Sequence, residues 1–263
     1  MQSTIDISWV QLALFMLILV IPFFINRYLK LALGKEIISA VLRMTVQLIL
    51  VGLYLQFLFE LNSLPLNLIW LTLMLLIGAS AIIDSAKLPK RRLYLPVITG
   101  LVVGVTPLIA ILLLALLQPT PLYSAQYMIP MAGMLLGNCL SGNIVALQRL
   151  FSAFEEQKDQ YEGALALGVT PYQAAFPFMQ SALKQSFAPI LASMTTTGLV
   201  TLPGMMTGQI LAGSDPMVAI KYQLVILVAI FVMLTVSVTL SLILSIRSCI
   251  DPSGLIKIRL FNK

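Results

Sequence analysis

The sequence predicts an all-α polytopic membrane protein with about seven transmembrane helices. Hydrophobic residues make up 59% of the 263 residues and charged residues only 10%, whereas soluble domains carry about 25% charged residues. The mean hydropathy of the chain is +0.99. Seven predominantly apolar stretches also approach or exceed the roughly 20 residues that a helix needs to cross a bilayer.

The seven stretches follow one another without a break in composition, so we expect a single transmembrane domain over residues 1–263. The predicted spans are Trp9–Ile25, Ile37–Phe59, Leu66–Ile83, Leu95–Leu117, Tyr127–Leu147, Pro189–Leu211 and Ala219–Ile246. The basic residues of the first span follow its apolar run instead of preceding it. We therefore interpret this span as a retained helix and not as a cleaved signal peptide.

Basic residues alternate from one connection to the next. The connections after the first, third, fifth and seventh spans hold every Lys and Arg of the chain except Arg43 and Lys221. Arg43 lies in the second span near the same side, whereas Lys221 falls on the other side with Asp6, Glu60 and Asp215. Because cytoplasmic connections are enriched in Lys and Arg, we expect the N-terminus outside and the C-terminus in the cytoplasm.

The composition argues against several classes of protein. The chain has two cysteines, far apart in sequence, and no histidine, so it shows no disulfide framework or zinc-site spacing. All acidic residues fall in connections, tails or span ends, whereas proton- or sodium-coupled carriers usually keep ionisable residues within the membrane. No nucleophile is paired with a base, so we predict no enzymatic activity. The basic connections account for the net charge of +6 without a nucleic-acid partner.

The only sizeable polar segment, from about residue 148 to 188, predicts a cytoplasmic elbow of two helices. Residues 153–167 are rich in helix formers, and Gly168 is a natural terminator because glycine readily adopts the left-handed conformation. Thr170, followed by proline at 171 and glutamine at 173, has the pattern of a capping box that starts a new helix. The segment taken alone also fits a solvated amphipathic hairpin.

The spacing Glu162-x-Ala164-x-x-x-Gly168 resembles the EAA loop of ABC-transporter permeases, whose elbow seats in a groove of a separate ATPase. A glycine replaces the first alanine, and the Leu-Pro pair of importer-type loops is not at its usual place. Small side chains let a partner approach closely, and the glutamate offers a charge to a basic pocket. The resemblance implies ATPase contacts at Glu162, Gly163, Ala164, Leu165, Gly168 and Pro171.

The sixth predicted span carries the most specific pattern of the chain. It reads Gly198-Leu-Val-Thr-Leu-Pro-Gly-Met-Met-Thr-Gly-Gln-Ile-Leu-Ala-Gly213. Other matching pieces are Arg43-x-x-x-Gln47-Leu-x-x-x-Gly52, Gly137-Asn138 and Leu165-Ala-Leu-Gly168. Together they resemble the FetB family of ABC permeases, bacterial proteins linked to iron export with relatives among plant and fungal aluminium-tolerance permeases. The resemblance extends from the second span to the seventh.

This resemblance implies an inner-membrane permease that forms a homodimer and binds a separate, homodimeric ABC ATPase. ATP and Mg²⁺ would then be held by the ATPase, and this chain would need no cofactor. The chain has no Gly-x-x-x-x-Gly-Lys-Ser/Thr phosphate-binding loop, which agrees with an external source of energy. The resemblance also implies iron or another metal as the exported substrate.

Within the sixth span, Pro203 would remove a backbone hydrogen bond and kink the helix, and Gly204-x-x-x-Gly208 has the spacing of a close-packing face. A broken helix beside several threonines is typical of a pathway wall or hinge, although simple helix packing is the alternative. The predicted pathway residues of this segment are Pro203, Gly204, Met205, Met206, Thr207, Gly208 and Gln209.

Four further polar residues within predicted spans are candidates for the pathway: Arg43, Gln47, Asn138 and Gln223. Arg43 and Gln47 share a helix face because they are four residues apart; Arg43 could instead reach the headgroups or bond a neighbouring helix. The 13 methionines are soft ligands better suited to copper(I) than to iron, or fillers of packed interfaces. The sequence therefore identifies no metal ligands.

Two other functions stay open at this point. The same machinery could export an organic or sugar-linked solute, or the chain could be a seven-helix receptor or scaffold that works without an ATPase. The elbow and the glycine-rich sixth span weigh against the receptor.

Overall fold

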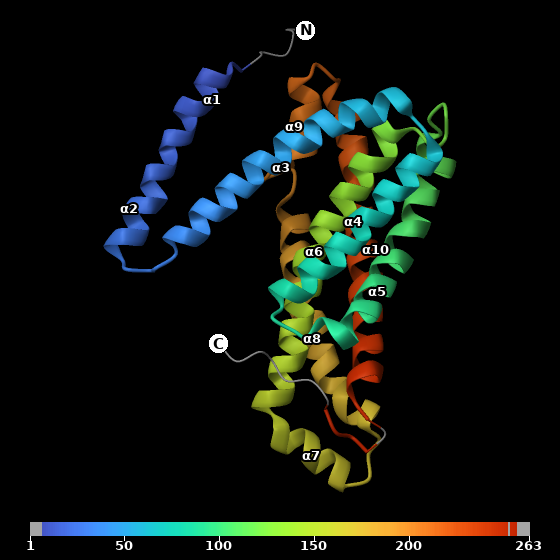
Figure 1. Cartoon of the computed structure of the whole chain (residues 1–263). Coiled ribbons are helices and arrows are strands. Elements are labelled where there is room, and N and C mark those ends of the chain that lie inside the picture. Colours follow the sequence, from blue (N-terminus) through green and yellow to red (C-terminus); the bar gives the residue numbers. More distant parts are fainter. Residues whose placement is uncertain (1–6, 252, 257–263) are drawn as a thin grey trace.

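The computed structural model describes residues 7–251 and 253–256, which form a long helix bundle with an N-terminal helical arm (Figure 1). The helices are α1 (Trp9–Met16), the 3-10 turn η1 (Leu17–Leu19), α2 (Val20–Tyr28), α3 (Gly34–Leu61), α4 (Leu64–Ser85), α5 (Lys90–Ile111), the π-helical turn η2 (Leu112–Leu117), α6 (Ala125–Glu156), α7 (Lys158–Ala166), α8 (Pro171–Thr196), α9 (Gly204–Leu211) and α10 (Pro216–Cys249). Asp6, Lys257, Arg259 and Lys263, which entered the predicted orientation, lie outside the described residues.

The predicted membrane bundle is confirmed, with six long apolar helices in the described part of the chain. They are Trp9–Tyr28, α3, α4, Lys90–Leu117, α6 and α10. The remaining predicted span, Pro189–Leu211, is not one helix. Instead, α8 continues from the elbow to Thr196, seven residues follow without helix, and α9 begins at Gly204. In Figure 1, α8 and α9 together run from the α7 end of the bundle to the opposite end, so this broken pair extends along the bundle as expected of the sixth predicted span.

The break in this span has a local cause. The hydroxyl of Thr195 donates to the Ala192 carbonyl at 2.8 Å, and that of Thr197 donates to the Ser193 carbonyl at 2.7 Å. Such bonds compete with the backbone pattern of a helix. Gly198 then adopts φ +89°, and Pro203 is the N-cap of α9. Pro203 therefore precedes a new helix and does not kink a continuous one, which corrects the expectation from sequence.

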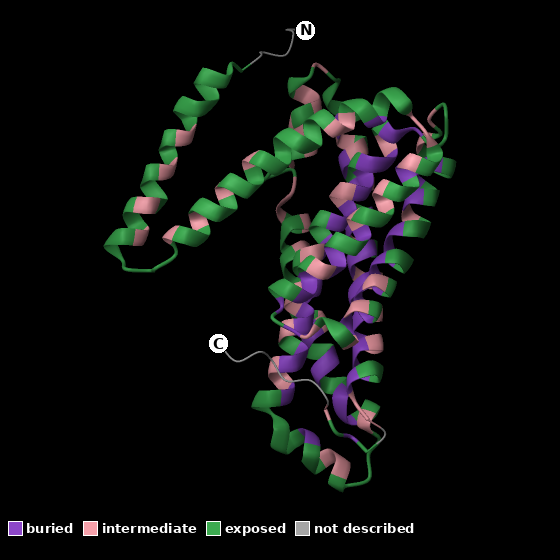
Figure 2. Ribbon diagram, viewed as in Figure 1, coloured by how far each residue is buried: buried purple, intermediate pink, exposed green. Residues whose placement is uncertain are grey.

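The core of the bundle lies where α10 packs against α5, α6 and α8, and α4 packs against α5 and α6. Figure 2 shows the buried residues concentrated along these helices. A side chain at Gly100 of α5 would collide with the Ser241 hydroxyl and the Ser237 backbone of α10, and one at Gly104 would press on Met233. This Gly-x-x-x-Gly pair therefore lets α5 and α10 approach closely.

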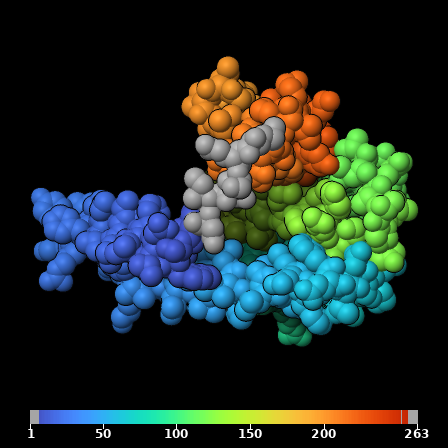
Figure 3. Space-filling view, turned by 90° about the horizontal axis from the view of Figure 1, so that it is seen from above, coloured from blue at the N-terminus to red at the C-terminus, as the bar shows by residue number. Residues whose placement is uncertain are grey.

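The N-terminal arm contrasts with the bundle because it buries almost nothing. No residue of α1 or α2 is buried, and Leu58 is the one buried residue of α3. Viewed end-on in Figure 3, the blue arm extends to one side of the bundle. Its exposed leucines and phenylalanines are compatible with acyl chains in a bilayer.

Candidate functional site

The polar elbow is present, although its first helix is shorter than predicted. The preceding membrane helix α6 continues to Glu156, and α7 occupies only Lys158–Ala166. Gly168 has φ +86°, the left-handed conformation that the sequence predicts for a terminator. The Thr170 hydroxyl accepts a bond from the Gln173 backbone, and the Gln173 side chain accepts one from the Thr170 backbone. The predicted capping box at the start of α8 is thus confirmed.

The inner face of α7 rests on a small aromatic cluster. Tyr161 is 2% exposed, and its ring centroid lies 5.3 Å from that of Phe154 on α6 and 6.4 Å from that of Phe178 on α8. Its hydroxyl donates a hydrogen bond to the Gly254 carbonyl at 3.1 Å. Burial raises the pKa of the Tyr161 hydroxyl, so it stays a neutral donor near pH 7. This anchor holds α7 at a fixed position on the end of the bundle.

The outer face of α7 is free to meet a partner, since no described part of the chain covers it. Glu162 and Gly163 are exposed, and Glu162 pairs with Lys158 at 3.4 Å in a solvated i,i+4 ion pair. Leu167 is 87% exposed, which leaves a large apolar side chain at the tip of the elbow. Leu167 was not predicted from sequence as a contact residue, although Leu167 directly precedes Gly168, the predicted helix terminator.

The residues predicted to contact an ATPase divide into two groups in the structure. Glu162, Gly163 and Gly168 are exposed, whereas Ala164, Leu165 and Pro171 are half-buried. Ala164 and Leu165 pack against the core, so they support the elbow from inside. The outer surface consists instead of the exposed group together with Leu167.

The predicted pathway segment lies at the opposite end of the bundle from α7 (Figure 1). Between α8 and α9, the Gly198 backbone donates to the Thr201 carbonyl at 2.9 Å, and Leu199 is 91% exposed. A side chain added at Gly204 or Gly208 would meet nothing within 4 Å. Their predicted close-packing face is therefore not used within the described chain.

Short helix α9 packs against α10. Met205, Met206, Thr207 and Gln209 are half-buried, and Met205 contacts the core. The Thr207 hydroxyl donates to the Pro203 carbonyl at 3.1 Å, whereas the Gln209 side-chain oxygen is buried with no hydrogen-bond partner in the described structure. Inside a membrane such an oxygen needs a hydrogen-bond donor, and no described residue donates to the Gln209 oxygen.

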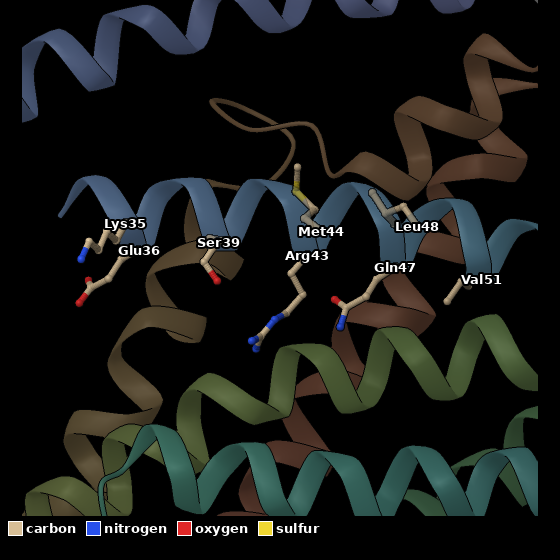
Figure 4. Close-up of a pocket in the computed structure, with 9 residues that line it drawn as sticks. Lys35, Glu36, Ser39, Arg43, Met44, Gln47, Leu48 and Val51 are labelled. Atoms are coloured by element: carbon tan, nitrogen blue, oxygen red, sulfur yellow. The ribbon is translucent and has the colours of Figure 1, made fainter.

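Arg43 and Gln47 lie on one face of α3, as predicted. Figure 4 shows both side chains on the same side of the helix as Ser39, toward the bundle, with Met44 pointing the other way. This face borders an open groove of about 700 Å³ that also includes Lys35 and Glu36. Arg43 is exposed to the groove.

The other two polar candidates have different surroundings. Asn138 donates to the Met134 carbonyl of its own helix at 2.8 Å and borders a cavity of about 250 Å³ between α6 and α8, together with Ser141, Ser186 and Ser193. Gln223 is 5% exposed within α10, and its side-chain oxygen has no partner among the described residues. The four candidates therefore occupy three separate settings.

A buried polar cluster was missed by sequence reasoning. The Asn143 amide of α6 donates to the Ser237 hydroxyl of α10 at 3.1 Å and to the Cys139 carbonyl at 3.1 Å. Ser237, Ser241 and Ser245 recur every fourth residue of α10 and are all buried. The four-residue spacing of the serines could have indicated a polar stripe on one face of this helix. It does not reveal which neighbouring helix that face contacts. Among the described residues, no group of three or more His, Cys, Asp or Glu could hold a metal ion.

Comparison with known proteins places the chain in a family. It matches the model of a family described as Uncharacterised protein family (UPF0014) over residues 9–250. It is 35% identical over 219 residues to UPF0014 membrane protein YjkA of Bacillus subtilis (strain 168), covering 83% of this chain and 86% of that protein. No solved structure is significantly similar.

Two further relatives carry more informative names. The chain is 37% identical over 199 residues to Protein ALUMINUM SENSITIVE 3 of Arabidopsis thaliana, covering 75% of this chain and 71% of that protein. It is 32% identical over 218 residues to Probable iron export permease protein FetB of Escherichia coli (strain K12), covering 82% of both. The FetB resemblance is thus confirmed, and the chain belongs to the UPF0014 family of multi-pass membrane proteins.

Proposed function

We propose that this chain is the membrane-spanning subunit of an ATP-driven exporter and works as a homodimer with a separate ABC ATPase. The observation that carries this proposal is the elbow at α7. Its inner face is fixed by the Tyr161 cluster, while its outer face exposes Glu162, Gly163 and the apolar Leu167. A rigidly held helix with an uncovered apolar tip is suited to enter a groove on a partner protein.

The positions of the basic residues support the orientation that this function needs. Lys90 and Arg92 at the start of α5, Lys158 of α7 and Arg247 near the end of α10 belong to connections or helix ends that the positive-inside rule assigns to the cytoplasm. The elbow would then face the compartment that contains ATP. The break between α8 and α9 would lie toward the outer side and act as the hinge or wall of the pathway.

Iron, or another metal, is the substrate that we infer first. This choice of substrate rests on the E. coli relative, whose name describes a probable iron export permease. Weak ligands would also suit an exporter, because a tightly bound metal would not be released. Met205 and Met206 follow the α8–α9 break directly, and their thioethers are soft groups close to it along the chain.

One observation favours a second substrate class, an organic solute that carries negative charge. Arg43, Gln47 and Ser39 present hydrogen-bond donors to the same groove on α3. An arginine within a membrane span is a functional-site candidate because its charge is expensive there, and its guanidinium suits carboxylate or phosphate oxygens. Accumulation of iron and of labelled anionic solutes in cells lacking the protein would separate the two classes.

Affinity purification of the tagged chain from its own membranes in mild detergent tests the ATPase partnership. We expect an ABC ATPase to purify with the wild-type chain and to be lost with Glu162→Lys combined with Leu167→Asp. Both side chains are exposed, so the substitutions alter the docking surface with little effect on folding.

A matched control is Leu31→Asp, which places the same charge on an exposed leucine of the α2–α3 connection. It should retain the ATPase. If no ATPase accompanies the wild-type chain, the exporter proposal is wrong. If the elbow variant and the control behave alike, an ATPase binds elsewhere and the role of α7 is refuted.

A further inference from the structure

The end of α10 is folded back onto the elbow. After α10, the Asp251 backbone donates to the Leu255 carbonyl at 3.0 Å, and the Gly254 backbone donates to the Asp251 carbonyl at 2.8 Å. A single β-bridge joins Ile250 to Ile256. These bonds define a tight turn, the C-terminal turn, whose described residues are 250–251 and 253–256. Ile250 and Ile256 both pack against the hydrophobic core.

The C-terminal turn contacts α7 at two points. Tyr161 donates its hydroxyl hydrogen bond to the Gly254 carbonyl at 3.1 Å. A Cβ at Gly254 would lie 2.5 Å from Cδ1 of Leu165, and Gly254 has φ +85°. Only glycine combines this conformation with such close approach, so the turn is fitted against α7.

The same turn is tied to the rest of the bundle through α10. The Ser248 hydroxyl near the end of α10 donates to the Arg92 carbonyl in the first turn of α5 at 2.9 Å. Farther along, α5 and α10 make the most extensive helix contact in the described structure, with Gly100 against Ser241. A displacement of the C-terminal turn would therefore be transmitted to the α5–α10 pair.

Along the chain, α7 is connected to α6 and α8 and not to α5 or α10. α7 follows α6 and precedes α8, so along the chain a movement of α7 acts first on those two helices and reaches α10 only through their packing against it. The aromatic contacts of Tyr161 also involve only Phe154 of α6 and Phe178 of α8. The hydroxyl of Tyr161, by contrast, joins α7 directly to the turn that follows α10.

We propose that Tyr161 is a positioning residue for coupling, which through Gly254 makes α7, α5 and α10 move together when a partner displaces the elbow. This inference rests on the proposed ATPase partnership. It assigns to the C-terminal turn a mechanical role and predicts that losing one hydroxyl uncouples the elbow from part of the bundle without removing its docking surface.

The test uses the full chain in complex with its ATPase, with spin labels at Asp159→Cys on α7 and Arg247→Cys on α10. Both positions are exposed, and the native Cys139 and Cys249 are buried. In the wild-type background we expect the α7–α10 distance to stay the same when a non-hydrolysable ATP analogue is added. In Tyr161→Phe we expect it to shift or broaden, because the hydroxyl is lost while the aromatic contacts remain.

Gly254→Ala should reproduce this change, and the double variant should add little to either single variant, as for two partners of one contact. Iron efflux per ATP hydrolysed should fall about fivefold in each, the equilibrium change expected for one ordinary hydrogen bond. Matched controls are Tyr28→Phe, on an exposed tyrosine, and Gly213→Ala, on another glycine with positive φ but open space around it.

The outcomes separate the two proposals. Absence of the ATPase from the wild-type complex refutes the exporter proposal. A bound ATPase with an unchanged α7–α10 distance in both variants refutes the coupling role of Tyr161. Parallel loss of ATPase binding in Tyr161→Phe would also overturn it, since that result indicates a misplaced docking surface.

Discussion

The side-chain amide of Asn143 on α6 donates a hydrogen bond to the Ser237 hydroxyl on α10 at 3.1 Å, although 94 positions separate the two residues. Both are fully buried, so this bond specifies how the two helices meet. Hydrogen bonds of this kind between membrane helices contribute about 0.6 kcal/mol on average.

We expect Ser237→Ala to lower the stability of the chain by about that amount, and Asn143→Ala to lower it more because the Cys139 bond and the packing are lost as well. A double-mutant cycle measured by unfolding in detergent should give a coupling energy near 0.6 kcal/mol. Thr235→Val is the control, because Thr235 bonds only its own helix at the Phe231 carbonyl. The effects of Thr235→Val and Asn143→Ala on stability should be additive. A coupling energy of zero between Asn143 and Ser237 would show that their hydrogen bond does not stabilise the chain.

Gly100→Ala should separate α5 from α10. The added methyl group would collide with the Ser241 hydroxyl and with the backbone of Ser237, and overpacking of this kind typically costs about 1–3 kcal/mol. The thermal unfolding midpoint in detergent should therefore fall.

Gly137→Ala gives the matched comparison, because a side chain there meets nothing within 4 Å. It should be neutral or slightly stabilising, since alanine favours a helix over glycine by about 1 kcal/mol. Equal effects of the two substitutions would show that α5 does not approach α10 as closely as the structure indicates.

Arg43 offers a test of the substrate class. If its guanidinium contacts the exported solute, Arg43→Gln should abolish export, Arg43→Lys should retain part of it because charge remains without the planar fork, and ATPase association should be unchanged in both. Export is measured as the loss of preloaded iron or of a labelled anionic solute. Arg27→Gln, at an exposed site at the end of α2, is the control. Normal export by Arg43→Gln would leave headgroup contact as the role of Arg43.

Gly198→Ala tests the break between α8 and α9. The glycine has φ +89° with open space around it, so alanine introduces a backbone penalty of about 1–2 kcal/mol without a collision. We expect slower export with the ATPase still bound, because the connection between the two helices is altered far from the elbow. Gly52→Ala in α3, also in open space, should export normally. An unchanged rate in Gly198→Ala would argue against a hinge there.

The sequence predicted most of the helices because a long apolar run in a membrane protein has few alternatives to a helix. It also predicted the start of α8, since Thr170, Pro171 and Gln173 act locally through capping. An interruption of the sixth span was predicted, but at Pro203. The end of α8 already at Thr196 was not predicted, because hydropathy continues across it and the competing threonine bonds depend on side-chain geometry that hydropathy does not measure.

The candidate site was also predictable only in part, because some of its features depend on local sequence and others on contacts between distant parts of the chain. The left-handed conformation of Gly168 could be predicted because a helix terminator depends on its neighbours in the chain. The partner of Tyr161 could not, since Gly254 lies 93 positions away and contact across the bundle leaves no periodic signal. Likewise, the outward position of Leu167 and the inward position of Leu165 depend on how α7 lies on the aromatic cluster.

The unburied N-terminal arm has a consequence for what holds it in place. Acyl chains are as apolar as leucine, so the exposed leucines and phenylalanines of α1–α3 gain nothing by leaving lipid for protein. Along the first half of α3, a neighbouring surface would therefore be selected by polar groups such as Ser39, Arg43 and Gln47, for which lipid is a poor solvent. In this part of the arm the hydrophobic residues favour immersion in lipid, and the polar side chains favour a particular protein surface.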